Sequence, residues 1–403
     1  MKKKILIFSL AYFPKHVGGA EVAIKEITDR ISPNEIEFHM VTNRFDSTLP
    51  KIEQVGNVLV HRIGITKENP TMADLSKWPL RINKILFQFL AAWKASRLHR
   101  THHYDGIWAM MAHSCGVPAA QFKIVHPRVP FLLTLQEGDP IDHIENEILP
   151  LWPLFKRAFT SADKIQAIST FLGKWARKRG FTGDLEIIPN GVSIKHFSQE
   201  YSDEEIQKAK MEIGKKTGDV YLVTTSRLVI KNAIDDVIRA LTLLPENVHF
   251  LVFGTGPDEE KLKMLAGKKG VSDRVIFWGL VDHADMPRYL KACDIFIRPS
   301  RSEGMGNSFV EAFAAELPVI ATQEGGIADF LFDEKRNPDK ETTGWAVDKN
   351  SPNQIAGAIR DIIKEPKKVM CVVQTAKKLA TEKYNWDTVA RDMKARVFDT
   401  LFL

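Results

Sequence analysis

The feature that most constrains the fold is an alternation of short apolar runs with helical patterns, which occurs twice along the 403 residues. The runs are rich in β-branched side chains, which is typical of strands buried on both faces of a parallel sheet. The predicted strands are 4–10, 36–42, 58–64, 106–110, 130–135, 165–169 and 185–189, then 220–226, 248–254, 275–279, 294–299, 318–322 and 344–347. The sequence therefore predicts an α/β protein with two doubly wound, Rossmann-like parallel-sheet domains.

The alternation stops in a charged stretch between residues 195 and 218. We therefore expect an N-terminal domain over 1–197, a linker region over 198–214 and a C-terminal domain over 215–380, each large enough to bury its own core. A last helix over 386–403 carries Val389, Met393 and Val397 at helical spacing. The pattern does not say what this helix packs against.

The composition is that of an ordinary soluble protein, with 44% hydrophobic and 26% charged residues. The apolar run behind the basic start is too short for a signal peptide and is interpreted as the first strand. Cys115, Cys293 and Cys371 lie far apart without metal-ligand spacing, which indicates a reducing compartment. We expect a cytoplasmic protein.

The segment 298–322 carries the most informative motif, in which Glu303 and Glu311 bracket a turn of small residues before a predicted helix. Small residues let backbone N–H groups approach an anion, and carboxylates accept hydrogen bonds from sugar hydroxyls. The predicted ligand is a sugar nucleotide, bound by Gly304, Met305, Gly306, Asn307, Ser308 and Glu311. The alternative is a capping box, with Ser308 as N-cap and Glu311 at the third helical position.

Arg227 and Lys231 follow the strand 220–226 and are four residues apart, a spacing at which like charges repel on a bare helix. A diphosphate between them would remove the repulsion. The alternative is a solvated pair in which Asp235 neutralises Lys231. The run FGTGPDE at 253–259 lacks the third glycine of a dinucleotide fingerprint, so we do not expect a nicotinamide site.

Two features of the first half also lie after strands. Gly18 and Gly19 form a turn that could bring a backbone amide to a phosphate, although any tight strand-to-helix turn can use such a pair. His113 follows the strand 106–110, where a parallel sheet presents ligand-binding residues. Its alternative is a capping or packing role.

In order along the chain, the motifs GGAE, SADKIQAIS, IPNGV, SRLVIKN, VFGTGP, FWGLV, EGMGNSFVEAFAAELPVIAT and YNW resemble those of the retaining glycosyltransferases of family 4. The resemblance spans nearly the whole chain. It implies the GT-B fold, in which two Rossmann-like domains face each other across a cleft and the last helix returns to the first domain.

The resemblance also implies residue roles. Glu303 contacts the donor hexose and Glu311 the ribose hydroxyls, Arg227 and Lys231 hold the diphosphate, and backbone near Gly19 assists. His113 matches a histidine beside the reacting sugar. Residues on the acceptor side are Gln136, Glu137 and Asp139.

The activity implied is transfer of a hexose from a UDP- or GDP-sugar to a glycan or lipid-linked acceptor, with retention of configuration. No cofactor is expected, and without an Asp-x-Asp motif no metal either; nucleic acid is not an expected partner. The alternatives are an epimerase of the same fold and a non-catalytic sugar-nucleotide-binding subunit. Four positions depart from the family's usual residues, namely Ser193, Gln136, Ala233 and Glu316.

The segment 77–100 is basic and contains no acidic residue. Within it, Ile82, Leu86, Phe89, Leu90 and Trp93 follow helical spacing, with Arg81, Lys84 and Gln88 opposite. One interpretation is an interfacial helix at an anionic membrane. The alternative is an ordinary domain helix whose apolar stripe lies in the core.

Overall fold

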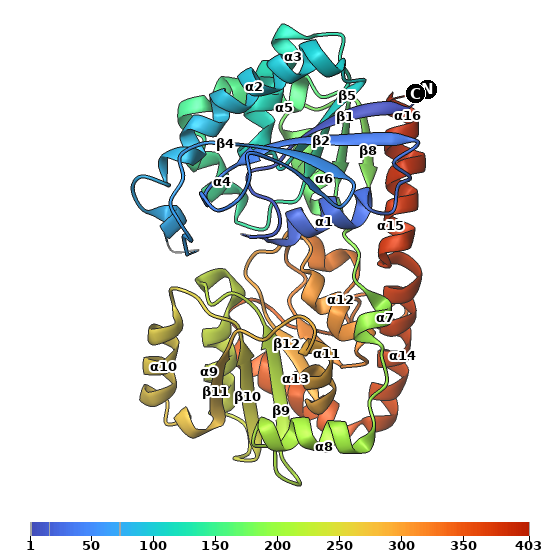
Figure 1. Ribbon diagram of the computed structural model, residues 1–403. Helices are drawn as coiled ribbons and strands as arrows, with labels where there is room; N and C mark the ends of the chain where they lie inside the picture. The colour runs from blue at the N-terminus through green and yellow to red at the C-terminus, as the bar shows by residue number, and fades with distance from the viewer. Residues whose placement is uncertain (1, 16, 72–73, 403) are drawn as a thin grey trace. The chain divides into compact units, whose positions relative to one another are not determined.

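The computed structural model describes residues 2–15, 17–71 and 74–402. The chain divides into two compact units, of which the first comprises Met1–Asn190 with Trp386–Leu403 and the second Gly191–Asn385 (Figure 1). The stretch 198–214, expected to be a linker, belongs to the second unit and contains α8 (Asp203–Glu212), and the short α7 (Ile194–Phe197) directly precedes it.

The first unit is built on an eight-stranded sheet with the order β3-β4-β2-β1-β5-β6-β7-β8. All neighbouring strands are parallel except β3 and β4, which form a hairpin. The strands are β1 (Lys3–Phe8), β2 (Ile36–Asn43), β3 (Ile52–Val55), β4 (Val58–Ile63), β5 (Gly106–Met110), β6 (Phe131–Leu135), β7 (Lys164–Ala167) and β8 (Asp184–Ile187). The sequence missed β3, because this edge strand is half-exposed and carries no continuous apolar run.

Helices cover both faces of this sheet (Figure 1). They are α1 (Gly19–Thr28), α2 (Ile82–His102), α3 (Val117–Val125), α4 (Ile141–Glu147), α5 (Trp152–Thr160), α6 (Thr170–Lys178), α15 (Trp386–Asp392) and α16 (Asp399–Phe402). The C-terminal segment packs on the first sheet, where Phe398, in the π-helical stretch Met393–Phe398 between α15 and α16, contacts the rings of Phe38 and Trp108. Chain segments at opposite ends of the sequence thus share one core.

The second unit has a six-stranded, wholly parallel sheet with the order β11-β10-β9-β12-β13-β14. The strands are β9 (Val220–Thr225), β10 (Val248–Phe253), β11 (Val275–Gly279), β12 (Ile295–Arg298), β13 (Val319–Ala321) and β14 (Trp345–Ala346). The connecting helices include α9 (Ile234–Leu241), α10 (Glu259–Lys268), α11 (Met286–Ala292), α12 (Asn307–Ala314), α13 (Pro352–Lys364) and α14 (Pro366–Lys383). Two doubly wound parallel sheets confirm the predicted fold class.

The apolar stripe that the sequence predicts on α2 does not lie in the core. Its buried side chains include Phe87, Ala91 and Ala95, whereas Ile82 and Leu86 are half-buried and Phe89, Leu90 and Trp93 are exposed. Gln88 is buried rather than exposed, and its amide donates to Ser114 O (3.2 Å). The interpretation of this stripe as core is therefore wrong.

Beside α2, buried histidines create a site that is sensitive to acid. His61 on β4 is 4% exposed, and neither ring nitrogen has a hydrogen-bond partner among the described residues. Burial lowers its pKa to about 4, and the charges of Lys94, His39 and His102 act in the same direction. An unfolded chain protonates this imidazole near pH 6.5. Stability is therefore present above that pH and declines as the pH falls towards 4.

We expect His61→Phe to remove this acid sensitivity. Between pH 7 and pH 5 the free energy of unfolding of the wild-type first unit should fall by about 2 kcal/mol because of His61. This value follows from the difference between the folded and unfolded pKa values. Urea unfolding at both pH values measures the loss. His143→Asn, at an exposed position of α4, is the control and should lose as much as the wild type. An equal loss in His61→Phe would contradict the prediction.

Candidate functional site

The predicted carboxylates lie in the second unit, after the carboxyl end of β12. Glu303 is held by Arg298, whose Nη2 donates to Glu303 Oε2 at 2.9 Å. Arg298 is the last residue of β12 and is only 6% exposed. The pairing places the carboxylate at the strand end beside a buried guanidinium of opposite charge.

Glu311 is the fifth residue of α12 and is half-buried. Burial raises the pKa of its carboxyl to about 7, and the charge of Arg298 opposes that rise. The charges of Glu303 and Glu311 both act on Arg298, opposing the effect of burial, which lowers the pKa of the guanidinium. Glu303 thus pairs directly with this buried cation, and Glu311 is near enough for its charge to act on it.

The capping-box alternative for Glu311 is wrong. The N-cap of α12 is Gly306, with φ of 87°, and no side chain caps the helix. Ser308 is the second helical residue, and its buried Oγ has no hydrogen-bond partner among the described residues. Glu311 lies beyond the first turn, where it cannot reach back to the cap. The helix N-terminus thus keeps backbone N–H groups for another acceptor.

Backbone packing fixes the turn that carries Glu303. Gly325 has φ of 62°, and a Cβ there would lie 1.9 Å from Glu303 O. The next residue, Gly326, donates its N–H to the same oxygen (3.1 Å). The two glycines therefore pack against the backbone carbonyl of Glu303 and fix its position, and these contacts do not involve the carboxylate.

Arg227 lies beyond the end of β9 and is exposed. The glycines of the run 253–259 pack on this loop: a Cβ on Gly254 would lie 2.0 Å from Ser226 O, and one on Gly256 2.3 Å from Leu228 O. Leu228 N–H also donates to Thr255 O (3.0 Å). These glycines are explained by close backbone approach, which agrees with the rejection of a nicotinamide fingerprint.

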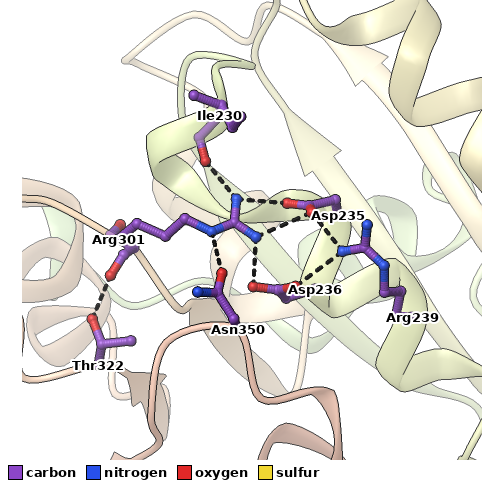
Figure 2. A network of polar contacts seen from close by, with 8 residues as sticks. Ile230, Asp235, Asp236, Arg239, Arg301, Thr322 and Asn350 are labelled. Carbon is purple, nitrogen blue, oxygen red and sulfur yellow. Dashed lines mark hydrogen bonds and ion pairs between the residues drawn. The ribbon is translucent and has the colours of Figure 1, made fainter.

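Lys231 lies on a short 3-10 helix, Ile230–Asn232, which Arg301 ties to α9 (Figure 2). Arg301 Nη1 donates to Ile230 O (2.7 Å), and its guanidinium binds Asp235 and Asp236. Asp235 also binds Arg239 at 2.5 Å. Asp235, the carboxylate that the sequence alternative paired with Lys231, thus forms ion pairs with two arginines.

Two departures from the family pattern lie at left-handed backbone positions. Ala233 has φ of 55° and Glu316 has φ of 63°. The resembling family usually has glycine at both positions. Glycine adopts the left-handed conformation freely, which explains why it suits them. Glu316 instead forms an ion pair with Lys377 (2.7 Å).

In the first unit, His113 follows β5 on a π-helical turn, Ala112–Gly116. Its Nδ1 faces Glu137 Oε1 at 3.5 Å, and its Nε2 lies 2.9 Å from Ser114 Oγ. Glu137 is buried and accepts the N–H groups of Ala112 (2.6 Å) and Gln136 (3.0 Å). We therefore revise Glu137 from an acceptor contact to a support for the turn that carries His113.

The remaining predicted residues of this unit differ in accessibility. Gln136 exchanges amide hydrogen bonds with Asn190 (3.0 and 3.2 Å), whereas Asp139 is exposed. Gly18 is the N-cap of α1, and its N–H donates to Glu21 Oε2 (2.7 Å). A Cβ on Gly19 would meet nothing within 4 Å. Of the two glycines, Gly19 is the one with space for a ligand.

In the described part of the chain, no cluster of three His, Cys, Asp or Glu could hold a metal ion.

Comparison with known proteins accounts for both units. Residues 17–196 match the family model described as Glycosyltransferase Family 4, and residues 205–379 match Glycosyl transferases group 1. The chain belongs to glycosyltransferase family 4. It is a glycosyltransferase that uses a nucleotide sugar.

Individual relatives support this family across the whole length. An uncharacterized glycosyltransferase of Methanocaldococcus jannaschii is 24% identical, with 96% of each chain covered. A GDP-mannose-dependent alpha-(1-6)-phosphatidylinositol monomannoside mannosyltransferase of Mycobacterium tuberculosis is 29% identical over 55% of this chain and 59% of its own. Anabaena HepE, solved in complex with UDP-glucose, has a TM-score of 0.76 at 20% identity and covers 98% and 99% of the two chains. The GT-B fold is thereby confirmed.

Sequence reasoning missed Arg298. The signal was available, because this arginine ends a run of core residues, Ile295–Ile297, in a strand with neighbours on both sides. A charged residue so placed is rare unless it has a partner. Periodicity alone could not say that the partner lies five residues further along the chain.

We expect Gly325→Ala to weaken donor binding by this glycosyltransferase although Gly325 has no side chain to bind it. The added Cβ collides with the Glu303 carbonyl and sits at a positive φ, which together should cost about 1–3 kcal/mol and displace Glu303. Calorimetric titration with a donor sugar nucleotide measures the affinity. Gly357→Ala, inside α13 with no atom within 4 Å of the added Cβ, is the control and should bind normally. Equal affinity in both variants would show that the turn does not depend on Gly325.

Proposed function

We propose that this enzyme transfers a hexose from a UDP- or GDP-sugar to its acceptor with retention of anomeric configuration. The observation that carries the proposal is the gathering of Glu303 and Glu311 around Arg298, beside the N-terminus of α12. Carboxylates are strong acceptors for sugar hydroxyls, and unpaired helix N–H groups are donors for phosphate. In this proposal Glu303 contacts the hexose and Glu311 the ribose.

The second unit also supplies cations for the leaving group. Arg227 and Lys231 bind the diphosphate and stabilise the charge that grows on it as the glycosidic bond breaks. We assign backbone and side-chain contacts with the donor to Gly304, Met305, Gly306, Asn307 and Ser308. The first unit contributes Gly19 and His113 to donor binding, with Gln136 and Asp139 on the acceptor side.

The proposed reaction proceeds by front-face displacement. The diphosphate leaves, an oxocarbenium-like hexose forms, and the acceptor hydroxyl attacks from the side that the diphosphate left, giving its proton to a leaving phosphate oxygen. Glu303 and His113 orient the hexose during this exchange. The relatives' names include a GDP-mannose-dependent enzyme and a protein solved with UDP-glucose, so both donors are reasonable probes.

We expect either UDP-glucose or GDP-mannose to raise the melting temperature, because a ligand of the folded state stabilises it by mass action. Slow hydrolysis of that donor, followed by NMR, should release the α-anomer first, and Glu303→Gln should slow the release. First appearance of the β-anomer would contradict retention. Donor binding without any turnover would favour a non-catalytic subunit, and formation of an epimeric sugar nucleotide would favour an epimerase.

We also propose that the acceptor is lipid-linked and that α2 contacts an anionic membrane. The exposed apolar side chains include Trp78 (79% exposed), Ile85 (63%) and Trp93 (61%), with Phe89 between the last two. Ile85, Phe89 and Trp93 are four residues apart and therefore neighbours on the helix surface. Exposed cations accompany them, namely Arg81, Lys84, Arg97 and Arg100.

This combination suits a helix lying in the headgroup region, with aromatic rings inserted and cations on lipid phosphates. Arg97 already stacks on Trp93, with its Cζ 5.9 Å from the ring centroid. No helix in the described ranges is both long enough and apolar enough to cross a bilayer. The proposal is accordingly one of peripheral contact.

We expect the protein to sediment with phosphatidylglycerol vesicles at low salt and much less with phosphatidylcholine vesicles, because the cations require anionic headgroups. The pair Phe89→Ser and Trp93→Ser should abolish binding, and Arg81→Gln with Lys84→Gln should weaken it. Met264→Ser, which removes an exposed apolar side chain from α10, is the control and should bind normally. No sedimentation of the wild type would contradict membrane contact.

A further inference from the structure

Arg298 is a buried cation to which the proposed function gives no role of its own. It ends β12, whose other side chains, Ile295, Phe296 and Ile297, are buried and apolar. Burying a guanidinium costs several kcal/mol unless its N–H groups and its charge are compensated. An apolar residue could fill the end of such a strand without this cost. The presence of an arginine there therefore suggests a role for its charge or its N–H groups.

Contacts on three sides fix the plane of the guanidinium. Nη2 donates to Glu303 Oε2 (2.9 Å), Nη1 donates to Thr225 O at the end of β9 (3.2 Å), and Cζ lies 4.3 Å from the ring centroid of Phe309. A Cβ on Gly306 would approach Nη2 to 3.0 Å. The turn before α12 is thus shaped around the arginine.

The charge around Arg298 is equally specific. Glu303 and Glu311 are two partly buried carboxylates that act on the same cation. Two carboxylates sharing a site without a cation favour protonation of one of them, which weakens it as an acceptor of hydrogen bonds. With Arg298 present, the site carries a smaller net charge, and the Glu303 carboxylate has a fixed direction.

We propose that Arg298 is a positioning residue for donor binding, which holds the Glu303 carboxylate in one orientation and supplies the buried positive charge that offsets Glu303 and Glu311. The inference rests on the proposed function, in which both carboxylates accept hydrogen bonds from donor hydroxyls. Arg298 itself is enclosed and acts through the two carboxylates. Burial raises the pKa of Glu311 to about 7 even with the arginine present, so its ionisation depends on the nearby cation.

The test compares Arg298→Met and Arg298→Lys in the full-length enzyme. The substrate is UDP-glucose or GDP-mannose, whichever stabilises the protein, and the assay measures nucleoside diphosphate release between pH 6 and pH 9. For Arg298→Met we expect kcat/KM to fall about 10- to 100-fold, the range for losing a hydrogen bond to a charged group. Its acid limb should also move to higher pH, because Glu311 without the cation ionises later.

Arg298→Lys keeps the charge but loses the planar stack and one of the two directed N–H groups. It should leave the acid limb in place and lower kcat/KM less than Arg298→Met does. Arg274→Met is the matched control, since Arg274 is half-buried and donates to Val248 O (2.9 Å) and Pro245 O (2.8 Å) at the opposite edge of the sheet. It should change the melting temperature without moving the pH profile.

A double-mutant cycle shows whether Arg298 acts through Glu303. If it does, Arg298→Met combined with Glu303→Gln should be little worse than Glu303→Gln alone. Additive losses, or an unmoved acid limb in Arg298→Met with only a lower melting temperature, would reduce Arg298 to a structural role and overturn the inference. Should Arg298→Met fail to fold, an Arg298→Lys variant equal to wild type in kcat/KM overturns it as well. Full activity in Glu303→Gln would refute the role of Glu303 in the proposed function instead.

Discussion

The organisation of this glycosyltransferase depends on burial of both faces of its parallel sheets. Helices on each side cover the strands, so side chains that a ligand can reach collect where the strands end. His113 follows β5, Arg227 follows β9, and Arg298 and Glu303 follow β12. The three segments differ in sequence, but the same constraint brings each of them to the carboxyl edge of its sheet.

Loops at this edge are held in part by close packing of backbone on backbone. Gly254 and Gly256 let one loop lie against the backbone of Ser226 and Leu228, and Gly325 does the same for Glu303. Such contacts leave the carboxylates and the exposed Arg227 available to a ligand. These contacts also explain how a glycine in these motifs can affect the site without touching a substrate. A Cβ at such a glycine would displace the backbone of the loop packed against it.

The predicted alternation of strands and helices was confirmed, with strand ends shifted by at most two residues. Continuous apolar runs of β-branched residues are strong signals, and β3 was missed because it is an edge strand without one. The interpretation of Ser308 and Glu311 as a capping box failed because the helix begins earlier, at Asn307 after a left-handed Gly306. The exposed face of α2 was ambiguous from sequence, since its core side mixes three alanines, whose apolar signal is weak, with polar Asn83 and Gln88.

By itself the sequence determined the two parallel sheets, the family and the segments that carry the candidate site. Those properties depend on local pattern and on motif order, both of which can be read along one chain. Only the tertiary structure decided that Arg298 links Glu303 to the charge of Glu311, that Glu137 supports the turn of His113, and that Trp93 faces outward. These are facts of direction and burial, and they depend on how side chains from different elements share space, which spacing along a chain does not specify.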